Sequence, residues 1–473
     1  MSAPPESSPS TPAPVPAAAA APPSTPPRPA AVDLAAATAP PPAEAAAAPG
    51  VRVRAGVSLH RLGRGFEALQ IPNFRIWSIG QLVSTTGTWM QSTAQAWLVL
   101  QLTDSPFAIG LVAVFQFFPV MMLALIGGVI ADRLPRYRLV LVTQTLSMIL
   151  ATIFGVLVGT GLIQLWQVYL LAFLNGLVTA IDVPSRQTFA IDLVDREHRA
   201  NAVALNSMLF NASRIIGPAL AGLLIGPLGI ATILYVNAAS FLAVLVGLLA
   251  MDTSGFDNAV SRSTGTMVER LREGLRYVRR TPEVLQVMIL VGAIGTFGYN
   301  FSVILPLISG FILHTDAAGF GAMGTALGLG SLAASLLMAY TRKLTIARLA
   351  AAAAAFAILL AAVAVTTRYN VTLGLLVAMG FAGVSFSTAA NTLLQLRVPD
   401  ELRGRVMSVY SLLFMGSTPV GGLFIGATAH SFGVPDALLL CAAICLAGVG
   451  AALLYGRGRE AGKAPGQPEP ARA

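Results

Sequence analysis

Polar side chains recur at intervals of three and four residues inside one apolar stretch early in the chain. They are Gln81, Ser84, Thr88, Gln91 and Gln95. In an α-helix this spacing places all five on one face. Lipid penalises such a face, so within a membrane it must contact protein or water. The face therefore either lines a cavity and hydrogen-bonds a solute, or it hydrogen-bonds a neighbouring helix.

A second stretch repeats this pattern and adds charge. It contains Asn175, Thr179, Asp182 and Arg186, at spacings of four, three and four residues. Asp182 and Arg186 form an i,i+4 pair of opposite charges near the end of the stretch. We interpret this pair as a candidate for coupling or gating, with a static surface ion pair as the alternative.

Arg214 places a positive charge within a third apolar stretch, just before Gly217 and Pro218. A charge at the centre of a membrane span costs roughly 2.5–3.5 kcal/mol on insertion scales, so it requires a partner or a hydrated cavity. Arg214 is therefore a further candidate for coupling or gating. The alternative is a structural bond to the backbone carbonyls that Pro218 leaves free.

A later apolar stretch is rich in residues that interrupt helices. These are Gly292, Gly295, Gly298 and Pro306. Irregular backbone in a membrane is tolerated where it lines a cavity, so Asn300 and Ser302 in this stretch are candidate solute contacts. Close packing of the small residues is the competing interpretation. Asn391, which lies four residues before Gln395, is a further candidate contact.

The sequence contains no residue set that is typical of catalysis or metal binding. Cys441 and Cys445 lie four residues apart in one apolar stretch, and no further ligand residues accompany them. A phosphate-binding loop and a nucleophile–base set are both absent. No carboxylate lies near the middle of a predicted membrane span. We therefore predict no enzyme, no cofactor and no metal site.

The composition defines the elements that must position these residues. Hydrophobic residues make up 55% of the chain and charged residues 11%, and the mean hydropathy is +0.73. A soluble domain has roughly 25% charged residues, so most of this surface must face something other than water. We predict an all-α membrane protein with twelve transmembrane helices in two six-helix bundles. The predicted spans are 76–101, 106–130, 138–160, 164–184, 203–226, 229–250, 284–311, 318–340, 346–366, 371–395, 404–428 and 433–455.

Positive residues gather on one side of this layout. The loops after even-numbered helices, with their flanking turns, contain eighteen, against one in the loops after odd-numbered helices. Cytoplasmic loops of membrane proteins carry such an excess, so we predict that both termini are cytoplasmic. The net charge of +9 follows from this distribution and does not indicate binding to nucleic acid.

The chain divides into five predicted parts. They are an Ala/Pro-rich disordered cytoplasmic tail (1–70), a first six-helix bundle (73–251), a cytoplasmic linker (252–283), a second six-helix bundle (284–456) and a cytoplasmic tail (457–473). An internal repeat supports the two bundles, because an offset of 204 residues pairs Gly217 with Gly421 and Gly222 with Gly426. The linker has apolar residues at helical spacing among arginines, which predicts an amphipathic helix on the inner membrane surface. The apolar residues are Met267, Leu271, Leu275 and Val278.

The segment GGVIADRLPRYR, which begins at Gly127, resembles the signature loop of the major facilitator superfamily. The resemblance implies a latch on the cytoplasmic side. Its residues would be Gly128, Asp132, Arg133, Arg136, Arg403 and Arg405. In such a latch Asp132 pairs with Arg403 or Arg405. Thr341 occupies the position of the acid in the second half, so the second copy of the motif is degenerate.

Several segments resemble one bacterial exporter branch of this superfamily, the branch that contains the enterobactin exporter and whose members are often called transmembrane secretion effectors. They include FRIWSIGQLVSTTGTWMQSTAQAWLVLQLTDSP, VPSRQTFAIDLV, NAVALNSMLFNASRIIGPALAG and VNAASFLAVL. Within them Gly217, Pro218 and Gly222 match an antiporter motif, GPxxGG, in which Ala221 replaces one glycine. Drug–proton antiporters also carry an arginine where this chain has Ala172, so their proton relay does not carry over.

The resemblance implies a monomeric transporter in a bacterial cytoplasmic membrane that works by alternating access. We expect it to export a small amphiphilic molecule, such as a drug, siderophore or secondary metabolite. The expected partners are the lipid bilayer, this small-molecule substrate and a coupling ion, with a proton preferred. Import of a small polar nutrient is the alternative within the class. A transporter-like membrane sensor without flux is the alternative outside it.

Overall fold

The computed structural model describes residues 66–253, 267–338, 341, 344–414 and 416–461, all within one compact unit, 35–473. Side chains are described for these residues except 124–133, 267–270 and 458–461. The two predicted tails lie mostly outside the described residues. Close to the first long helix, the 3-10 helix η2 (Glu67–Gln70) contains Ala68, which is buried and donates its N–H to Asn201 Oδ1 at 3.0 Å. Helical structure therefore begins before the predicted bundle boundary at residue 73.

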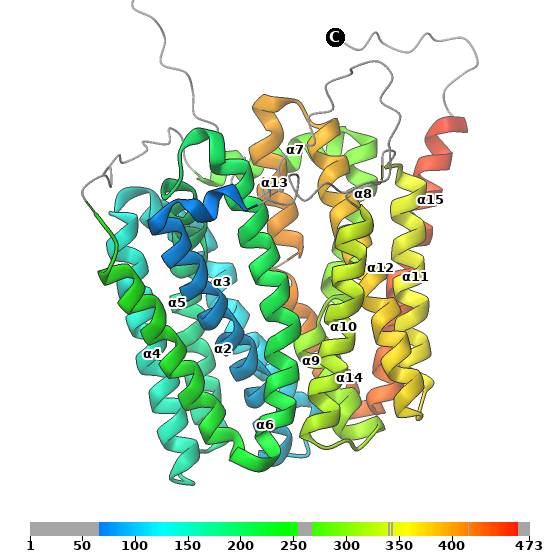
Figure 1. Ribbon diagram of the computed structural model, residues 1–473. Helices are drawn as coiled ribbons and strands as arrows, with labels where there is room; N and C mark the ends of the chain where they lie inside the picture. Colours follow the sequence, from blue (N-terminus) through cyan, green and yellow to red (C-terminus); the bar gives the residue numbers. More distant parts are fainter. Residues whose placement is uncertain (1–65, 254–266, 339–340, 342–343, 415, 462–473) are drawn as a thin grey trace, which may run out of the picture. The chain divides into compact units, whose positions relative to one another are not determined.

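Five long helices form the first half of the described chain (Figure 1). They are α2 (Pro72–Leu102), α3 (Pro106–Arg133), α4 (Arg136–Gly159), α5 (Leu165–Asp192) and α6 (Arg199–Leu249), with the 3-10 helix η3 (Arg196–His198) before α6. The element α6 contains two predicted spans, because the chain turns at Gly229. The φ of 78° at Gly229 lies in the left-handed region that favours glycine.

The helix α5 is longer than predicted, since it continues through Pro184 to Asp192. The predicted span ended at residue 184 because proline removes one backbone hydrogen bond and usually ends or kinks a helix. Here Thr188 donates its hydroxyl to the carbonyl oxygen of Pro184 at 2.9 Å, within the continued helix. As a result, Asp182 lies ten residues before the helix end instead of two before it.

The second half follows the linker helix α7 (Met267–Arg280). Its elements are α8 (Pro282–Ala293), η4 (Ile294–Gly298), α9 (Phe301–Leu307), η5 (Ile308–Ile312), α10 (Ala317–Met338), α11 (Ile346–Val365), α12 (Tyr369–Arg397), α13 (Asp400–Phe414), α14 (Thr418–Phe432) and α15 (Val434–Ala461). Two predicted spans are interrupted. The seventh consists of α8, η4, α9 and η5, with η4 and η5 in π-helical form, and the eleventh consists of α13 and α14.

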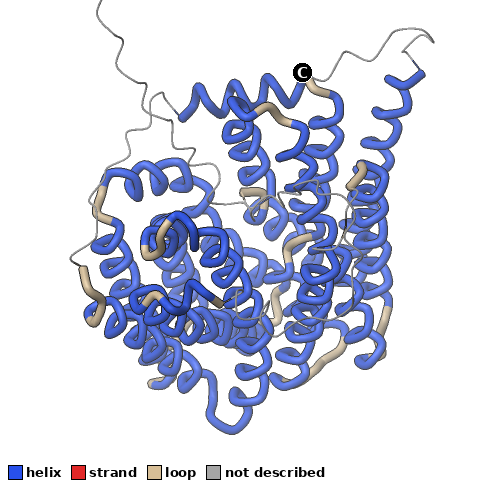
Figure 2. Tube along the Cα trace, turned by 45° about the horizontal axis from the view of Figure 1, so that its top comes forward, coloured by secondary structure: helices blue, strands red, loops and turns tan. Residues whose placement is uncertain are grey.

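Ten stretches of the described chain are long and apolar enough to cross a membrane. One of them, Arg196–Leu249, has 54 residues and contains both spans of α6. The 31-residue α2 is not among the ten, because its polar stripe lowers its hydropathy. Counting α6 twice and adding α2 gives the twelve predicted spans. The described residues contain no strand (Figure 2), so the all-α prediction is confirmed.

The linker helix α7 packs against protein on the face that contains Val278, which is 2% exposed. A Cβ atom on Gly274 would lie 2.5 Å from the carbonyl oxygen of Arg405 in α13, so the two helices approach closely here. Leu275 is 40% exposed and lies beside Arg276 on the outer face. The predicted apolar face is thus divided between a protein contact and an exposed side.

The two halves of the chain meet at glycines. A Cβ atom on Gly321 of α10 would lie 2.5 Å from the carbonyl oxygen of Pro218 in α6, and one on Gly222 would lie 2.8 Å from Gly321 Cα. The helices α3 and α14 approach in the same way, because a Cβ atom on Gly110 would lie 2.5 Å from the carbonyl oxygen of Gly422. Small residues permit such close approach of helices in membranes.

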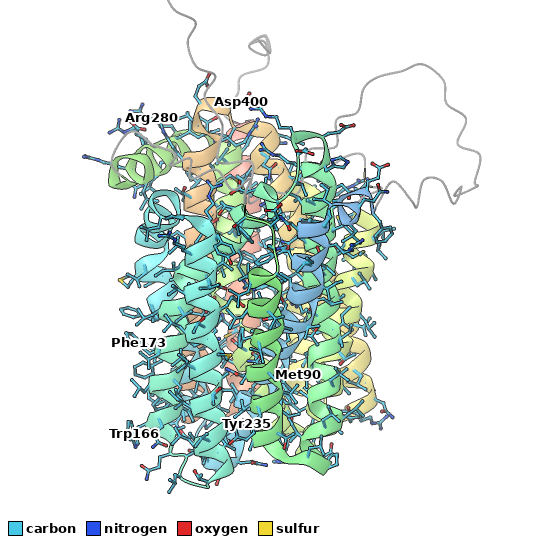
Figure 3. All side chains as sticks on the ribbon, turned by 60° about the vertical axis from the view of Figure 1, so that its left-hand side comes forward. Met90, Trp166, Phe173, Tyr235, Arg280 and Asp400 are labelled. Carbon is cyan, nitrogen blue, oxygen red and sulfur yellow. The ribbon has the colours of Figure 1, made fainter. Side chains whose placement is uncertain are left out.

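These glycine contacts lie away from the arginine-rich loops. Gly321 and Gly110 lie near the beginnings of α10 and α3. Each of these helices follows a loop that comes after an odd-numbered predicted span, and those loops are poor in arginine. Figure 3 shows Arg280 and Asp400 at one end of the helices, whereas Trp166 and Tyr235 lie toward the opposite end. The halves are therefore packed together toward the end opposite the arginine-rich loops, which we call the glycine-packed end.

Candidate functional site

A buried ion pair lies at the centre of a polar network in the first half. Arg186 Nε lies 2.7 Å from Asp182 Oδ2, and the Asp182 side chain is only 8% exposed. Asp182 Oδ1 accepts hydrogen bonds from Thr143 Oγ1 at 2.6 Å and Gln144 Nε2 at 2.9 Å. Arg186 also donates to Gln81 Oε1 at 3.0 Å. The network joins α2, α4 and α5, with Asp182 buried and the Arg186 side chain 27% exposed.

The predicted stripe on α2 divides between several environments. Gln81 joins the ion-pair network, and Gln91 Oε1 accepts a hydrogen bond of 2.7 Å from Asn237 in the second span of α6. Ser84 and Gln95 are buried, with no exposure at Ser84 and 8% at Gln95. Thr88 is exposed, although its hydroxyl also donates to the Ser84 carbonyl oxygen. Helix–helix bonding therefore explains Gln91, whereas Thr88 remains available to a solute.

Arg214 on α6 extends over an aromatic side chain of α2. Its guanidinium carbon lies 5.8 Å from the ring centroid of Trp89, a distance at which a cation–π attraction forms. Trp89 in turn makes an edge contact with Phe210, at 6.0 Å between ring centroids. Ser207 and Asn211 continue the same face of α6 at spacings of four and three residues. The face combines a cation, two aromatic rings and polar groups.

The motif after Arg214 is a packing element. A Cβ atom on Gly217 would collide with Trp89 Cβ and would lie 3.0 Å from the carbonyl oxygen of Thr86, so α2 and α6 pack closely here. Pro218 and Gly222 face α10 in the contact described above. This geometry holds Trp89 against α6 and thereby positions it beneath Arg214.

The remaining candidates on α5 lie on a helix that packs against α3. A Cβ atom on Gly176 would collide with the carbonyl oxygen of Gln116, so the two backbones are close together. Asn175 and Thr179 are half-buried, and the Thr179 hydroxyl donates to the Asn175 carbonyl oxygen at 2.7 Å. Their role as solute contacts stays a prediction.

The interrupted seventh span places Asn300 at its break. Asn300 is 1% exposed, and its side-chain amide donates to the Thr296 carbonyl oxygen at 2.6 Å. This bond satisfies a carbonyl near the end of the π-helical turn η4, where the regular backbone pattern stops. Ser302, two residues later, is exposed. In α12, Asn391 accepts a hydrogen bond from Gln395.

The predicted latch is only partly visible. Gly128, Asp132 and Arg133 belong to α3, but their side chains lie outside the described ones. Arg136 pairs with Asp192, at the end of α5. Arg403 pairs with Asp400. Arg405 Nη1 lies 2.7 Å from Glu273 Oε2 of the linker helix α7.

Several functional candidates were missed in the sequence. Thr143 and Gln144 were overlooked because nothing local indicates that they meet Asp182. Trp89 was overlooked because an aromatic residue in a membrane span is ordinarily a packing residue. The spacing of Ser207, Asn211 and Arg214 was a readable signal, since the three share one helical face. Among the described residues no group of three His, Cys, Asp or Glu side chains comes close enough to hold a metal ion.

The part of the chain that the structure describes has twelve apolar spans in two halves that meet at glycines, and polar and charged groups lie within these spans, as in a multi-pass membrane transporter. The family model described as "Transmembrane secretion effector" matches residues 64–465. The chain therefore belongs to the transmembrane secretion effectors of the major facilitator superfamily, a family of transporters and not of enzymes.

Curated relatives cover most of the chain at low identity. The "Staphyloferrin A transporter" of Staphylococcus aureus is 25% identical, over 74% of this chain and 87% of the relative. The "Multidrug efflux pump Tap" of Mycolicibacterium fortuitum is 27% identical, over 75% of this chain and 88% of the relative. The crystal structure of the nucleoside transporter NupG has a TM-score of 0.64 at 11% identity and covers 82% of this chain and 99% of its own, which shows the shared fold alone.

Proposed function

We propose that this transporter exports a small amphiphilic molecule, such as a drug, siderophore or secondary metabolite, across a bacterial cytoplasmic membrane. The observation that carries the proposal is the face formed by Thr88, Trp89, Phe210 and Arg214, which combines polar, aromatic and cationic groups within membrane spans. Polar and charged groups at this depth must contact protein or a hydrated cavity, and the exposure of Thr88 and Phe210 supports a cavity. Relatives named as an efflux pump and a siderophore transporter support this cargo class.

The charge distribution supports a membrane orientation. The arginine-rich loops are assigned to the cytoplasm by the positive-inside rule, together with both termini. With this orientation the glycine-packed end faces outward, and its close helix contacts support a state closed to the outside. Cargo would enter the cavity from the cytoplasm, and separation of α6 from α10 and of α3 from α14 would release it. We propose that a monomer carries out this cycle.

The coupling ion is proposed to be a proton, with Asp182 and Arg186 as the coupling pair. Asp182 is the one carboxylate among the buried residues that the structure describes. Its oxygens are held by a cation and two neutral donors, so protonation of the carboxylate would release Arg186 and change the contact with Gln81. A buried ionisable group whose partners change on protonation can couple a gradient to a conformational change.

Export predicts a defined pattern of metabolites in cells and medium. Relative to wild type, a deletion strain should retain at least one compound in the cells, and an overproducing strain should enrich the same compound in the medium. Untargeted mass spectrometry of both fractions measures this, with the wild-type strain as the reference. Proteoliposomes with an imposed proton gradient then test transport of the compound directly.

Two other results would contradict export. A compound that accumulates inside overproducing cells would instead indicate import of a nutrient. No flux of any cargo, combined with a signalling defect on removal of residues 1–65, would indicate a membrane sensor.

The proposed latch gives a second prediction. Asp132→Asn should reduce the transport rate about ten-fold while leaving membrane insertion unchanged, because the loss of a charge-assisted pair at the cytoplasmic end weakens the state closed there. Transport in proteoliposomes and the amount of protein in membranes are the measurements. Glu273→Gln is the matched control, since Glu273 competes for Arg405 and its loss should not slow closure. Wild-type transport by Asp132→Asn would contradict the latch.

A further inference from the structure

Arg214 carries a positive charge within a membrane span, and the described part of the protein provides no carboxylate that pairs with it. Arg214 lies fifteen residues after the first residue of α6 and fifteen before Gly229, where the chain turns. At 1.5 Å per residue, both distances are about 22 Å, which places its backbone near the middle of the membrane. Within the described residues, Arg214 forms no salt bridge. The buried carboxylate, Asp182, is engaged with Arg186.

Among the described residues no salt bridge engages the guanidinium group of Arg214, which lies over the Trp89 ring. A cation–π contact uses the delocalised charge, whereas the N–H donors lie in the guanidinium plane and form a fork that matches a carboxylate or sulfonate. An arginine that is held over an aromatic ring is also conformationally restrained, so less entropy is lost when an anion binds. Arg214 is thus prepared to bind a planar or tripodal oxyanion.

The surroundings of Arg214 indicate what the rest of the ligand resembles. Trp89 and Phe210 offer aromatic surface beside the cation, and Phe210 is 50% exposed. Thr88 and Ser207 are exposed polar residues on the facing helices α2 and α6. A ligand that satisfies both environments has an apolar, ring-containing body and one anionic group.

The two halves of the protein are unequal at this position. The repeat offset of 204 residues pairs Phe210 with Phe414 but pairs Arg214 with Thr418. The second half therefore repeats the aromatic residue and lacks the cation. This asymmetry favours one anionic group, bound on the side of the first half, over a symmetric dianion.

We propose that Arg214 is the anion-binding residue of the cargo site and that the cargo is an amphiphile with a single carboxylate or sulfonate-like group. This inference rests on the proposed function and narrows its substrate class. An anion of this kind crosses lipid poorly, so its passage across the membrane requires a carrier. The charge of Arg214 is then neutralised by cargo when the site is occupied, and an occupied carrier places less uncompensated charge in the membrane than an empty one.

The test compares two fluorescent probes that share a ring framework and differ in charge. The probes are 8-anilinonaphthalene-1-sulfonate, which is anionic, and N-phenyl-1-naphthylamine, which is neutral. Each is titrated into the full-length protein in nanodiscs, and the signal from empty nanodiscs is subtracted. The variants are Arg214→Gln, which removes the charge, and Arg214→Lys, which keeps it but removes the planar fork. Arg368→Gln, an exposed arginine outside the site, controls for the change in net charge.

The wild-type protein should bind the sulfonate more tightly than the neutral amine. Arg214→Gln should weaken binding of the sulfonate about ten-fold and leave binding of the amine unchanged, because a desolvated charge-assisted hydrogen bond is lost. Arg214→Lys should bind the sulfonate with an affinity between those of the wild type and Arg214→Gln, because it keeps the charge and loses the planar fork, and Arg368→Gln should keep the full affinity. The apparent thermal midpoint of each variant, measured without probe, reports whether the fold is kept.

Three results would overturn the proposal. They are a wild-type protein that does not prefer the sulfonate, equal weakening of both probes by Arg214→Gln, and unchanged binding of the sulfonate by that variant. Equal weakening would assign Arg214 to the packing of α2 on α6. Flux in proteoliposomes is measured separately, so a protein that binds the sulfonate through Arg214 and moves nothing would refute export while leaving this inference intact.

Discussion

Asp182→Asn should lower the stability of the protein by about 3 kcal/mol and abolish transport. The substitution leaves the Arg186 guanidinium without a counter-charge inside the first half, and breaking a buried ion pair on one side costs about 3–5 kcal/mol. The Arg186 side chain is 27% exposed, so the lower end of this range applies. The oxygen of the new amide can still accept a hydrogen bond from Thr143. The amide NH2 group would face the Arg186 guanidinium, and because both groups are donors they cannot hydrogen-bond to each other. The apparent midpoint of thermal unfolding and the flux in proteoliposomes measure the two effects.

A double substitution separates stability from coupling. Asp182→Asn combined with Arg186→Gln removes both charges and should recover most of the lost stability, since no uncompensated charge stays buried. Transport should stay lost if the pair couples the proton gradient. Recovery of transport in the double variant would show that the pair is purely structural.

The exposed pair of Arg403 and Asp400 provides the matched control for stability. It also lies within one helix, at a spacing of three residues, but the Asp400 side chain is 78% exposed. Asp400→Asn should therefore change the midpoint little, because solvent screens a surface ion pair and its contribution is small. A loss of stability as large as that of Asp182→Asn would contradict the assignment of the effect to burial.

The helices were predictable because each span carries its own signal. An apolar run of about twenty residues indicates a membrane helix wherever it occurs, and the arginine distribution predicts which loops are cytoplasmic. The ends were less predictable where a local signal and the tertiary structure disagree. Pro184 indicates a helix end, yet α5 continues past it to Asp192. Because of this difference of eight residues, the sequence placed Asp182 near the end of a helix, whereas it lies ten residues before that end.

The site was predictable as a set of faces and not as a set of contacts. The spacing from Gln81 to Gln95 predicted one polar face of α2, and the structure divides that face between buried, half-buried and exposed positions. It could not indicate that Gln81 would bond Arg186 and Gln91 would bond Asn237, because these partners are 105 and 146 residues away in the chain. Trp89 lies beside this face, and only the approach of α6 makes it a partner of Arg214. Local periodicity determines which residues share a face, whereas the packing of helices determines what that face meets.

Gly321→Ala should hold the protein open at the glycine-packed end and reduce transport about ten-fold or more. The added Cβ atom would lie 2.5 Å from the Pro218 carbonyl oxygen and 2.6 Å from Gly222 Cα, and both are backbone atoms that cannot rotate away. Overpacking of a tight contact costs about 1–3 kcal/mol, and here the cost falls only on the state in which α6 and α10 touch. By the usual conversion, a cost of that size shifts the equilibrium between the two states by roughly 5- to 150-fold.

Gly226→Ala is the matched control, because Gly226 lies on the same helix as Gly222 and a Cβ atom there would have no neighbour within 4 Å. The state of the protein is read from a single cysteine at Thr88, a residue of the exposed face of α2, with Cys441 and Cys445 replaced by alanine. A membrane-impermeant maleimide added outside intact cells should label this cysteine faster in Gly321→Ala than in the parent, and at the parental rate in Gly226→Ala. Parental labelling and transport in Gly321→Ala would show that contact between α6 and α10 does not seal the outer end. Faster labelling with unchanged transport would mean that closure at this end does not limit the rate of the cycle.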